Sequence, residues 1–377
     1  ESDRSLVGSE MCIRDRSFAE ALAIGSLLKE GYQVRLAGQD SGRGTFSQRH
    51  SVFYDQKTEE RYIPLNNISK KQKEFEIVDS FLSELGVLGF EYGYSLADPN
   101  TLVMWEAQFG DFANGAQIII DQFITSSERK WMQMSGLVML LPHGHEGMGP
   151  EHSSARVERF LQMAAEDNIQ IVNCTTPASY FHALRRQIHR NFRKPLIVFT
   201  PKSTLRHPNN ISHIEEFTGK TSFHRVIDDD IKNPKRVVFC SGKIFYELDD
   251  YRSEHKIKDV KIIRIEQIYP FPFDRLSEIL MKYKDCEMIW AQEEPKNMGT
   301  WGFVKSRIRH VFVQNNYEKK IHYVGRRPAA APATGISKRH ITNQMLIKEL
   351  ALKSPLKRVI KERSGVSFMK FKNLPKE

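Results

Sequence analysis

The sequence predicts an α/β protein made of two doubly wound domains. Its 377 residues, 40% of them apolar, are enough for two ordinary cores, because a domain usually takes about 100 to 200 residues. Helix-like and strand-like segments alternate over two stretches, which is typical of helices layered on a mostly parallel sheet. Between these stretches, residues 206–233 are polar, contain scattered Gly and Pro and keep no sustained period, so we predict a linker there.

The first predicted domain covers residues 17–205. Phe18 to Lys29 has apolar residues at helical spacing and is followed by Gly31, which ends the helix. Short apolar runs predict strands at Val34 to Ala37, Leu102 to Trp105, Leu137 to Leu141, Ile169 to Val172 and Leu196 to Phe199. Amphipathic helices are expected between the later strands, at Asp111 to Lys130, Ser153 to Glu166 and Ser179 to Arg190.

The second predicted domain covers residues 234–353 and has the same alternation. Strands are expected at Arg236 to Cys240, Val260 to Ile265 and Met288 to Ala291. Helices are expected near Ile244 to Ser253, Asp274 to Lys282, Trp301 to Val311 and Lys338 to Leu352.

The two ends differ in character from the domains. Residues 1–16 include SLVGSEMCIRDR, which resembles a translated sequencing-adapter fragment, so we predict a non-native segment; the alternative is a genuine N-terminal arm. From Lys353 onward there are eight Lys or Arg residues and two Glu, so +6 of the net charge of +10 lies at this end, and we predict a basic tail at residues 354–377. Such a tail is more often a solvated extension or a docking arm than a reader of nucleic acid, and we expect no nucleic-acid binding.

The cysteines and the hydropathy of the sequence argue against a disulfide-bonded protein, a metal site built on cysteine and a membrane-spanning protein. The four cysteines form no CxxC pair and have no neighbouring His at metal-ligand spacing, so they are expected to be reduced thiols in a cytosol-like compartment. No apolar run approaches the roughly 18 to 20 residues that span a bilayer. We therefore expect a soluble protein that does not bind a membrane.

The first motif whose residues could take part in binding or catalysis is SELGVLGFEYG, residues 83–93. Glu84 falls in the first turn of a predicted helix, where its charge favours the helix dipole, and Gly86 and Gly89 permit close packing. A purely structural role is the simpler interpretation of this motif taken alone.

The second motif is WEAQFGDFANGAQ, residues 105–117, where a predicted strand ends in a turn. Ligands gather at the C-terminal ends of strands in open α/β sheets, and the rings of Phe109 and Phe112 suit contact with a flat ring. The alternatives are ordinary core packing for the two phenylalanines and a helix N-cap for Asp111.

The third motif is PHGHEGMGPEHSSARVERF, residues 142–160, a strand followed by a glycine-rich loop with three histidines. His143, His145 and His152 lack the companions of a zinc site, so metal binding is not expected here. An imidazole can donate a hydrogen bond to an anionic substrate and titrates near neutral pH. Ser153 is expected to be a helix N-cap, with contact to substrate as the alternative.

Together these motifs resemble the thiamin-diphosphate-dependent first component of 2-oxoglutarate dehydrogenase complexes. FAEALAIGSLLKEGYQVRLAGQDSGRGTFSQRH, TPKSTLRHP and RIEQIYPFP extend the resemblance to about residues 17–350. It implies a transketolase-like pyrimidine-binding domain followed by a transketolase C-terminal-like domain. GQDSGRGTF then becomes an interface loop, and Arg206 and His207 become candidates for binding an anionic regulator, with a solvated turn as the alternative.

The resemblance also implies roles for the motif residues. Glu84 would hydrogen-bond a ring nitrogen of the cofactor's aminopyrimidine and activate it. Phe109, Phe112 and Asp111 would line the aminopyrimidine pocket. His152 would stabilise substrate or intermediate, with His143 at the rim of the same pocket and Ser153 beside it.

The implied reaction is oxidative decarboxylation of 2-oxoglutarate in the tricarboxylic acid cycle, with transfer of the succinyl group to a lipoyl arm. The family's GDG motif and later Asn, which hold Mg²⁺ and the cofactor's phosphates, do not occur, so we expect a fragment with half an active site that is inactive alone. Expected partners are a second copy in a homodimer and the lipoylated dihydrolipoyl succinyltransferase core. The expected location is the bacterial cytoplasm, or the mitochondrial matrix in a eukaryote. Alternatives are a 2-oxoadipate dehydrogenase first component and a non-catalytic dimerisation or assembly fragment.

Overall fold

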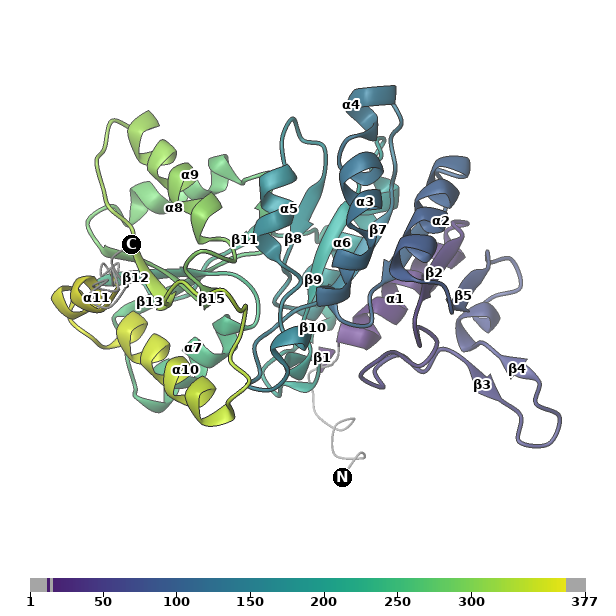
Figure 1. Cartoon of the computed structure of the whole chain (residues 1–377), viewed down its shortest axis with the longest axis horizontal. Coiled ribbons are helices and arrows are strands. Elements are labelled where there is room, and N and C mark those ends of the chain that lie inside the picture. Colours follow the sequence, from purple (N-terminus) through teal and green to yellow (C-terminus); the bar gives the residue numbers. More distant parts are fainter. Residues whose placement is uncertain (1–11, 14–15, 364–377) are drawn as a thin grey trace, which may run out of the picture.

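The computed structural model describes residues 12–13 and 16–363 and contains two α/β units, each built on its own main sheet. In Figure 1 the first unit, purple to teal, lies to the right of the second, which is green to yellow. Among the described residues, no helix is long and apolar enough to cross a membrane.

The first sheet has seven strands, of which the six from the N-terminal unit run parallel. In spatial order its strands are β14 (Gln267–Tyr269), β8 (Gln170–Val172), β9 (Leu196–Thr200), β7 (Val138–Pro142), β6 (Leu102–Glu106), β2 (Val34–Gly38) and β5 (Phe75–Asp79). The edge strand β14 is antiparallel to β8 and comes from the range predicted for the second domain.

Helices cover both faces of this sheet, as the doubly wound prediction requires. One face packs against α1 (Arg16–Lys29) and α6 (Pro177–His189). The opposite face packs against the elements that carry the candidate site: α2 (Glu84–Ala97), the 3-10 helix η3 (Gly110–Ala116), α3 (Gln117–Ile119), the π-helical turn η4 (Ile120–Ile124) and α5 (Val157–Met163). The α4 helix (Ser127–Trp131) follows η4.

The second sheet has five strands, in the order β11 (Val226–Ile227), β13 (Val260–Ile265), β12 (Arg236–Cys240), β15 (Glu287–Pro295) and β16 (His322–Arg326). One face is covered by α8 (Phe273–Lys282) and α9 (Trp301–Gln314). The other is covered by α7 (Ile244–Glu254), α10 (Ser337–Leu352) and α11 (Leu356–Arg363). The two-unit α/β class is therefore confirmed.

The small remaining elements lie at the edges of the two units. A hairpin is formed by β3 (Phe53–Tyr54) and β4 (Arg61–Tyr62), and the 3-10 turn η2 (Pro64–Asn67) leads to β5. Residues 206–233 are mostly coil, with β10 (Ser212–His213), the 3-10 turn η7 (Ile214–Phe217) and β11. β10 pairs with β1 (Cys12–Ile13), so two residues of the adapter-like segment are paired; the origin of that segment stays a prediction.

Two predicted helices are wrong in extent. The predicted helix from Asp111 to Lys130 is split into η3, α3, η4 and α4, where η3 packs against α2. The predicted helix from Ser153 to Glu166 begins only at Val157, after Arg156 in a left-handed conformation. The sequence analysis also missed β5, β14, β16 and the β3–β4 hairpin.

Candidate active-site surface

Glu84 is the first residue of α2 and is only partly buried. The hydroxyl of the N-cap residue Ser83 accepts a hydrogen bond from the Gly86 amide at 3.3 Å, which satisfies one of the free donors of the first turn. A Cβ on Gly115 of η3 would lie 3.3 Å from Oε2 of Glu84, so the glycine leaves room for the carboxylate to lie against η3. Within the described residues the Glu84 carboxylate makes no hydrogen bond or ion pair, which leaves it available to a ligand.

An aromatic cluster lies next to η3 and joins the second and third motifs. The ring centroids of Phe109 and His152 are 4.4 Å apart, and those of Phe112 and His152 are 5.7 Å apart. Phe109 and Phe112 are 5.9 Å apart and nearly perpendicular, and Phe46 packs edge-on against Phe109 at 5.6 Å. All four side chains remain partly or largely accessible. The structure therefore brings His152 together with both phenylalanines and with the loop GQDSGRGTF, which contains Phe46.

Asp111 connects η3 to the histidine loop. Its Oδ1 accepts hydrogen bonds from the amides of Ser153 and Ser154 at 3.2 and 3.0 Å. Burial raises the pKa of Asp111 and outweighs these hydrogen bonds, which lower it. Asp111 therefore holds the loop that presents His152; whether it also contacts a cofactor stays a prediction.

Ser153 is not the N-cap of the helix that follows it, and that prediction is wrong. Its hydroxyl donates to the carbonyl oxygen of Gly149 at 2.8 Å, and the helix after it starts at Val157 with Arg156 as N-cap. The side chain is 1% exposed. It closes the turn around Gly149, whose φ of +61° favours glycine.

His143 lies beneath the aromatic cluster instead of at an open rim. It is 6% exposed, its Nε2 lies 2.8 Å from Oε1 of Glu294, and its Nδ1 accepts a hydrogen bond from the Ala155 amide at 3.1 Å. The amide identifies Nδ1 as the unprotonated nitrogen, so Nε2–H donates to Glu294. Both ring nitrogens are thus already used, and contact of His143 with substrate stays a prediction.

A buried charged network below the histidine loop was missed by the sequence analysis. Lys243 Nζ lies 2.9 Å from Oε2 of Glu293 and 2.6 Å from Oε1 of Glu247, and the His145 amide donates to Glu293 at 3.2 Å. Burial raises the pKa of Glu293, but Lys243 and His145 together, by charge and hydrogen bonding, outweigh burial and hold that pKa well below its usual range. The AQEEP string at the end of a predicted strand was the available signal, since polar groups after strands often converge.

Another missed contact supports the backbone beside the cluster. Lys202, 8% exposed, donates from Nζ to the carbonyl oxygen of His152 at 2.5 Å. Burial lowers the pKa of Lys202 and outweighs the nearby carboxylates that raise it.

His207 pairs with Asp250 at 3.3 Å, while the side chain of Arg206 lies outside the described residues. Anion binding at that turn stays a prediction.

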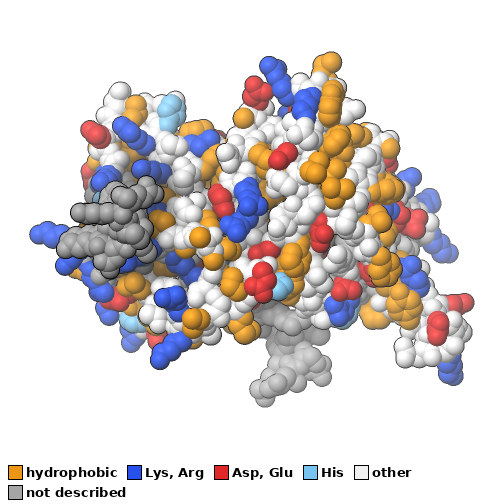
Figure 2. All heavy atoms as spheres, viewed as in Figure 1, with side chains coloured by type: hydrophobic (Ala, Val, Ile, Leu, Met, Phe, Trp, Pro, Cys, Tyr) orange, Lys and Arg blue, Asp and Glu red, His pale blue; other side chains and the backbone are white. Residues whose placement is uncertain are grey.

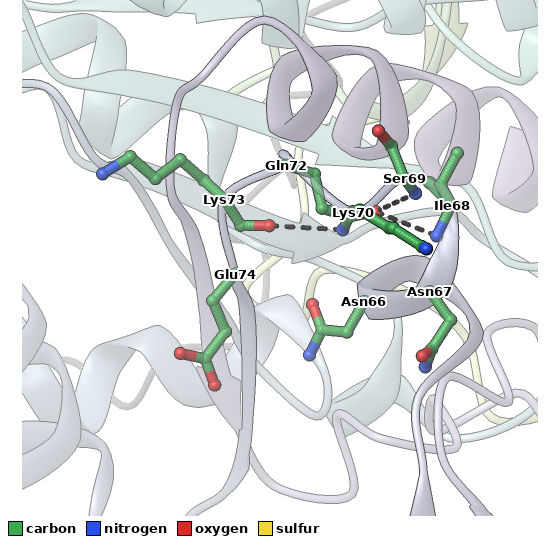
Figure 3. Close-up of a pocket in the computed structure, with 8 residues that line it drawn as sticks. All are labelled: Asn66, Asn67, Ile68, Ser69, Lys70, Gln72, Lys73 and Glu74. Carbon is green, nitrogen blue, oxygen red and sulfur yellow. Dashed lines mark hydrogen bonds between the residues drawn. The ribbon is translucent and has the colours of Figure 1, made fainter.

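A separate open hollow of about 540 Å³ lies in the loop before β5 and is not part of this surface. Figure 3 shows the eight residues that line it, which all come from this loop: Asn66, Asn67, Ile68, Ser69, Lys70, Gln72, Lys73 and Glu74. Gln72 Oε1 accepts hydrogen bonds from the amides of Ile68 and Ser69, and its Nε2 donates to the carbonyl oxygen of Leu65. These polar groups hold the loop itself. In the part of the chain that the structure describes, no group of three His, Cys, Asp or Glu side chains is placed to hold a metal ion.

Comparison with known proteins agrees with the two-unit architecture. Residues 15–208 match the family model of the transketolase pyrimidine-binding domain, and residues 211–352 match that of the 2-oxoglutarate dehydrogenase C-terminal region. The 2-oxoglutarate dehydrogenase E1 component of Brucella anthropi is 55% identical over 352 residues, which cover 90% of this chain and 35% of the relative. The proteins of that name from Brucella abortus and Brucella suis are 54% identical, again over 90% of this chain and 35% of the relative.

The chain thus spans about a third of the length of these curated relatives. Both family models match in the order that the resemblance implied, and together they cover nearly all of the two units. The chain therefore belongs to the family of 2-oxoglutarate dehydrogenase E1 components, and it corresponds to their transketolase-type pyrimidine-binding domain and C-terminal region.

Proposed function

We propose that this chain supplies the aminopyrimidine side of a thiamin-diphosphate site in an enzyme that oxidatively decarboxylates 2-oxoglutarate. The observation that best supports this is the position of three side chains at one short helix, η3. The Glu84 carboxylate, which has no hydrogen-bond or ion-pair partner among the described residues, lies against η3, and the partly exposed rings of Phe109 and Phe112 lie at the same helix. A carboxylate and flat apolar rings are the groups that a protonatable aromatic ring requires. The residues present therefore fit that half of the cofactor.

When bound, thiamin diphosphate supplies the electron sink that decarboxylation requires. Glu84 would share a proton with the aminopyrimidine ring and thereby orient and activate it. Phe109 and Phe112 would exclude water from the ring. His152, which meets Phe109 edge-on, would donate a hydrogen bond to the substrate, and Asp111 would keep its loop in place. The Mg²⁺ ion that holds the diphosphate would be bound by a part of the enzyme not contained in this sequence.

An exposed apolar surface beside Glu84 supports a homodimer. Seven large apolar side chains lie more than a third exposed on or next to α2, α3 and α4: Phe81, Leu82, Leu85, Phe90, Ile118, Trp131 and Met132. Figure 2 shows hydrophobic side chains gathered over these elements. Contiguous apolar patches of this kind mark interaction sites. We propose that a second copy covers the patch and completes the site, and that the assembled enzyme works in the cytoplasm with a lipoylated dihydrolipoyl succinyltransferase core that receives the succinyl group.

The decisive test replaces Glu84 by Gln in the full-length enzyme. Because the amide cannot share the proton, turnover should fall by roughly 100-fold or more while folding is kept. Glu254→Gln, an exposed change at the end of α7, is the matched control and should leave turnover unchanged. Retained turnover in Glu84→Gln would contradict the assigned role.

Two further measurements separate the alternatives. Calorimetry of this chain with thiamin diphosphate and Mg²⁺ should show no tight binding, and tight binding would refute the half-site proposal. Comparing kcat/KM of the full-length enzyme for 2-oxoglutarate and 2-oxoadipate distinguishes the two substrates. Activity with neither acid would favour a non-catalytic assembly role.

A further inference from the structure

A basic cavity of about 420 Å³ lies between the second half of α6 and the segment that follows η7. Four arginines and two histidines line it, together with phenylalanine rings and short polar residues; these basic residues are His182, Arg185, Arg186, His189, Arg190 and Arg225. No carboxylate is among its described lining residues. The cavity is on the α1–α6 face of the first sheet, opposite the face that carries Glu84.

Arg186 is the unusual member of this set. Its Nε and Nη2 atoms are shielded from solvent, yet within the described residues they have no hydrogen-bond partner. The guanidinium carbon lies 4.0 Å from the centroid of the Phe223 ring, so the group is stacked and held in a fixed orientation. A shielded guanidinium without an acceptor is costly, because a buried polar group normally finds one.

The neighbouring charges make this cost larger. Burial is the main cause that lowers the pKa of Arg186, to about 9, and the charge of Arg190 lowers it further. Only Cys174 acts in the opposite direction. Burial and the charge of Arg225 lower the pKa of Arg190 too, and its described side-chain hydrogen bond goes to the uncharged Gln170, at 2.5 Å. Arg185 and Arg225, by contrast, pair with Glu30 and Asp274 at 2.8 and 2.5 Å. Two arginines facing the cavity thus carry charge that no described carboxylate compensates.

We propose that this cavity binds a compact phosphate-bearing anion, held by Arg186 and Arg190 with Arg225 at the rim. A phosphate would accept hydrogen bonds from the guanidinium of Arg186, whose planar shape suits two parallel hydrogen bonds. The histidines at the rim are already bonded, His182 to the Glu216 carbonyl oxygen at 2.8 Å and His189 to Glu30 at 3.0 Å. The inference is independent of the proposed catalytic function.

The test uses the 377-residue chain titrated with sodium phosphate and with pyrophosphate at pH 7, with ionic strength held constant by sodium chloride. Calorimetry and thermal unfolding should show saturable binding and a Tm that rises with phosphate concentration. Arg186→Gln should weaken phosphate binding roughly 10- to 100-fold, the range expected for loss of a hydrogen bond to a charged group. Binding of pyrophosphate but not phosphate would identify a diphosphate group as the ligand and support the same site.

Two further variants keep the result interpretable. Arg129→Gln makes the same charge change on an 85%-exposed side chain of α4 that is not among the lining residues of the cavity, and should leave phosphate binding unchanged. Arg225→Gln, with a side chain 41% exposed, should fold normally and weaken phosphate binding about two- to fivefold. The inference is overturned if phosphate acts no differently from chloride, or if Arg186→Gln binds it as the unaltered chain does. If Arg186→Gln does not fold, unchanged binding in Arg225→Gln overturns it instead.

Discussion

Gly149 determines where His152 lies, so we expect one added methyl group to disturb the candidate site. A Cβ at this position would lie 2.8 Å from Nδ1 of His152, and the φ of +61° is a left-handed conformation. That conformation costs a residue with a Cβ roughly 1 to 2 kcal/mol. Gly149→Ala should therefore lower the free energy of unfolding by about that amount, measured in urea, and shift the His152 ring resonances measured by NMR.

Gly93 in α2 is the matched control for this prediction at the residue scale. A Cβ there meets no atom within 4 Å, and the residue is in the middle of the helix. Gly93→Ala should raise the free energy of unfolding by roughly 0.5 to 1 kcal/mol, because alanine favours a helix interior. Equal effects of the two glycine substitutions would contradict the geometry described for Gly149.

At the scale of the element, the start of α2 places Glu84. The Ser83 hydroxyl caps the helix by accepting from the Gly86 amide, and the carboxylate follows it directly. Ser83→Ala should lower the free energy of unfolding by about 1 kcal/mol, because a free amide donor loses its partner. In the full-length enzyme it should also reduce turnover, because the first turn frays.

Ser83→Thr retains a hydroxyl acceptor and is the control for this element. It should keep most of the stability and most of the turnover, since threonine is also a good N-cap residue. If Ala and Thr at this position behave alike in chemical unfolding and in assays, the cap does not position Glu84.

At the scale of the whole molecule, the network around Lys243 joins the two units. Glu293 and Glu294 belong to β15 of the second sheet, while His143 and His145 follow β7 of the first. Removing one member of a buried ion pair leaves the other uncompensated, at a cost of about 3 to 5 kcal/mol. Lys243→Met should therefore lower the free energy of unfolding by that order at pH 7, and adding Glu293→Gln should recover part of the loss.

The same network predicts a dependence of stability on pH. The pKa of Glu293 is held well below its ordinary value of 4.5, mainly by Lys243 acting against burial. A carboxylate with a lowered pKa contributes stability that is present above its unfolded pKa and is lost as the pH falls through its folded pKa. Urea unfolding of the unaltered chain should show a loss of stability below about pH 4.5 that Lys243→Met/Glu293→Gln lacks; an identical slope in both proteins would exclude Glu293 as a source.

Several elements and motif residues were predictable because their signals are local. β12 and β13 have the predicted bounds, Arg236 to Cys240 and Val260 to Ile265, since short segments rich in Val and Ile mark buried strands. The motifs also indicated the correct family, and three of their side chains, Phe109, Phe112 and His152, do lie together. Their roles with cofactor and substrate stay predictions.

Other features depend on residues far apart in the chain, and periodicity carries no information about them. The split of the helix predicted from Asp111 follows from packing of η3 against α2 and the histidine loop. β14 pairs with β8 although it lies among the strands of the second unit. The sequence by itself therefore determined the α/β class, most element positions and the family. Only the tertiary structure decided that His143 bonds Glu294, 151 residues away, and that Nε and Nη2 of Arg186 have no acceptor among the described residues, because such contacts arise when distant strands and helices pack.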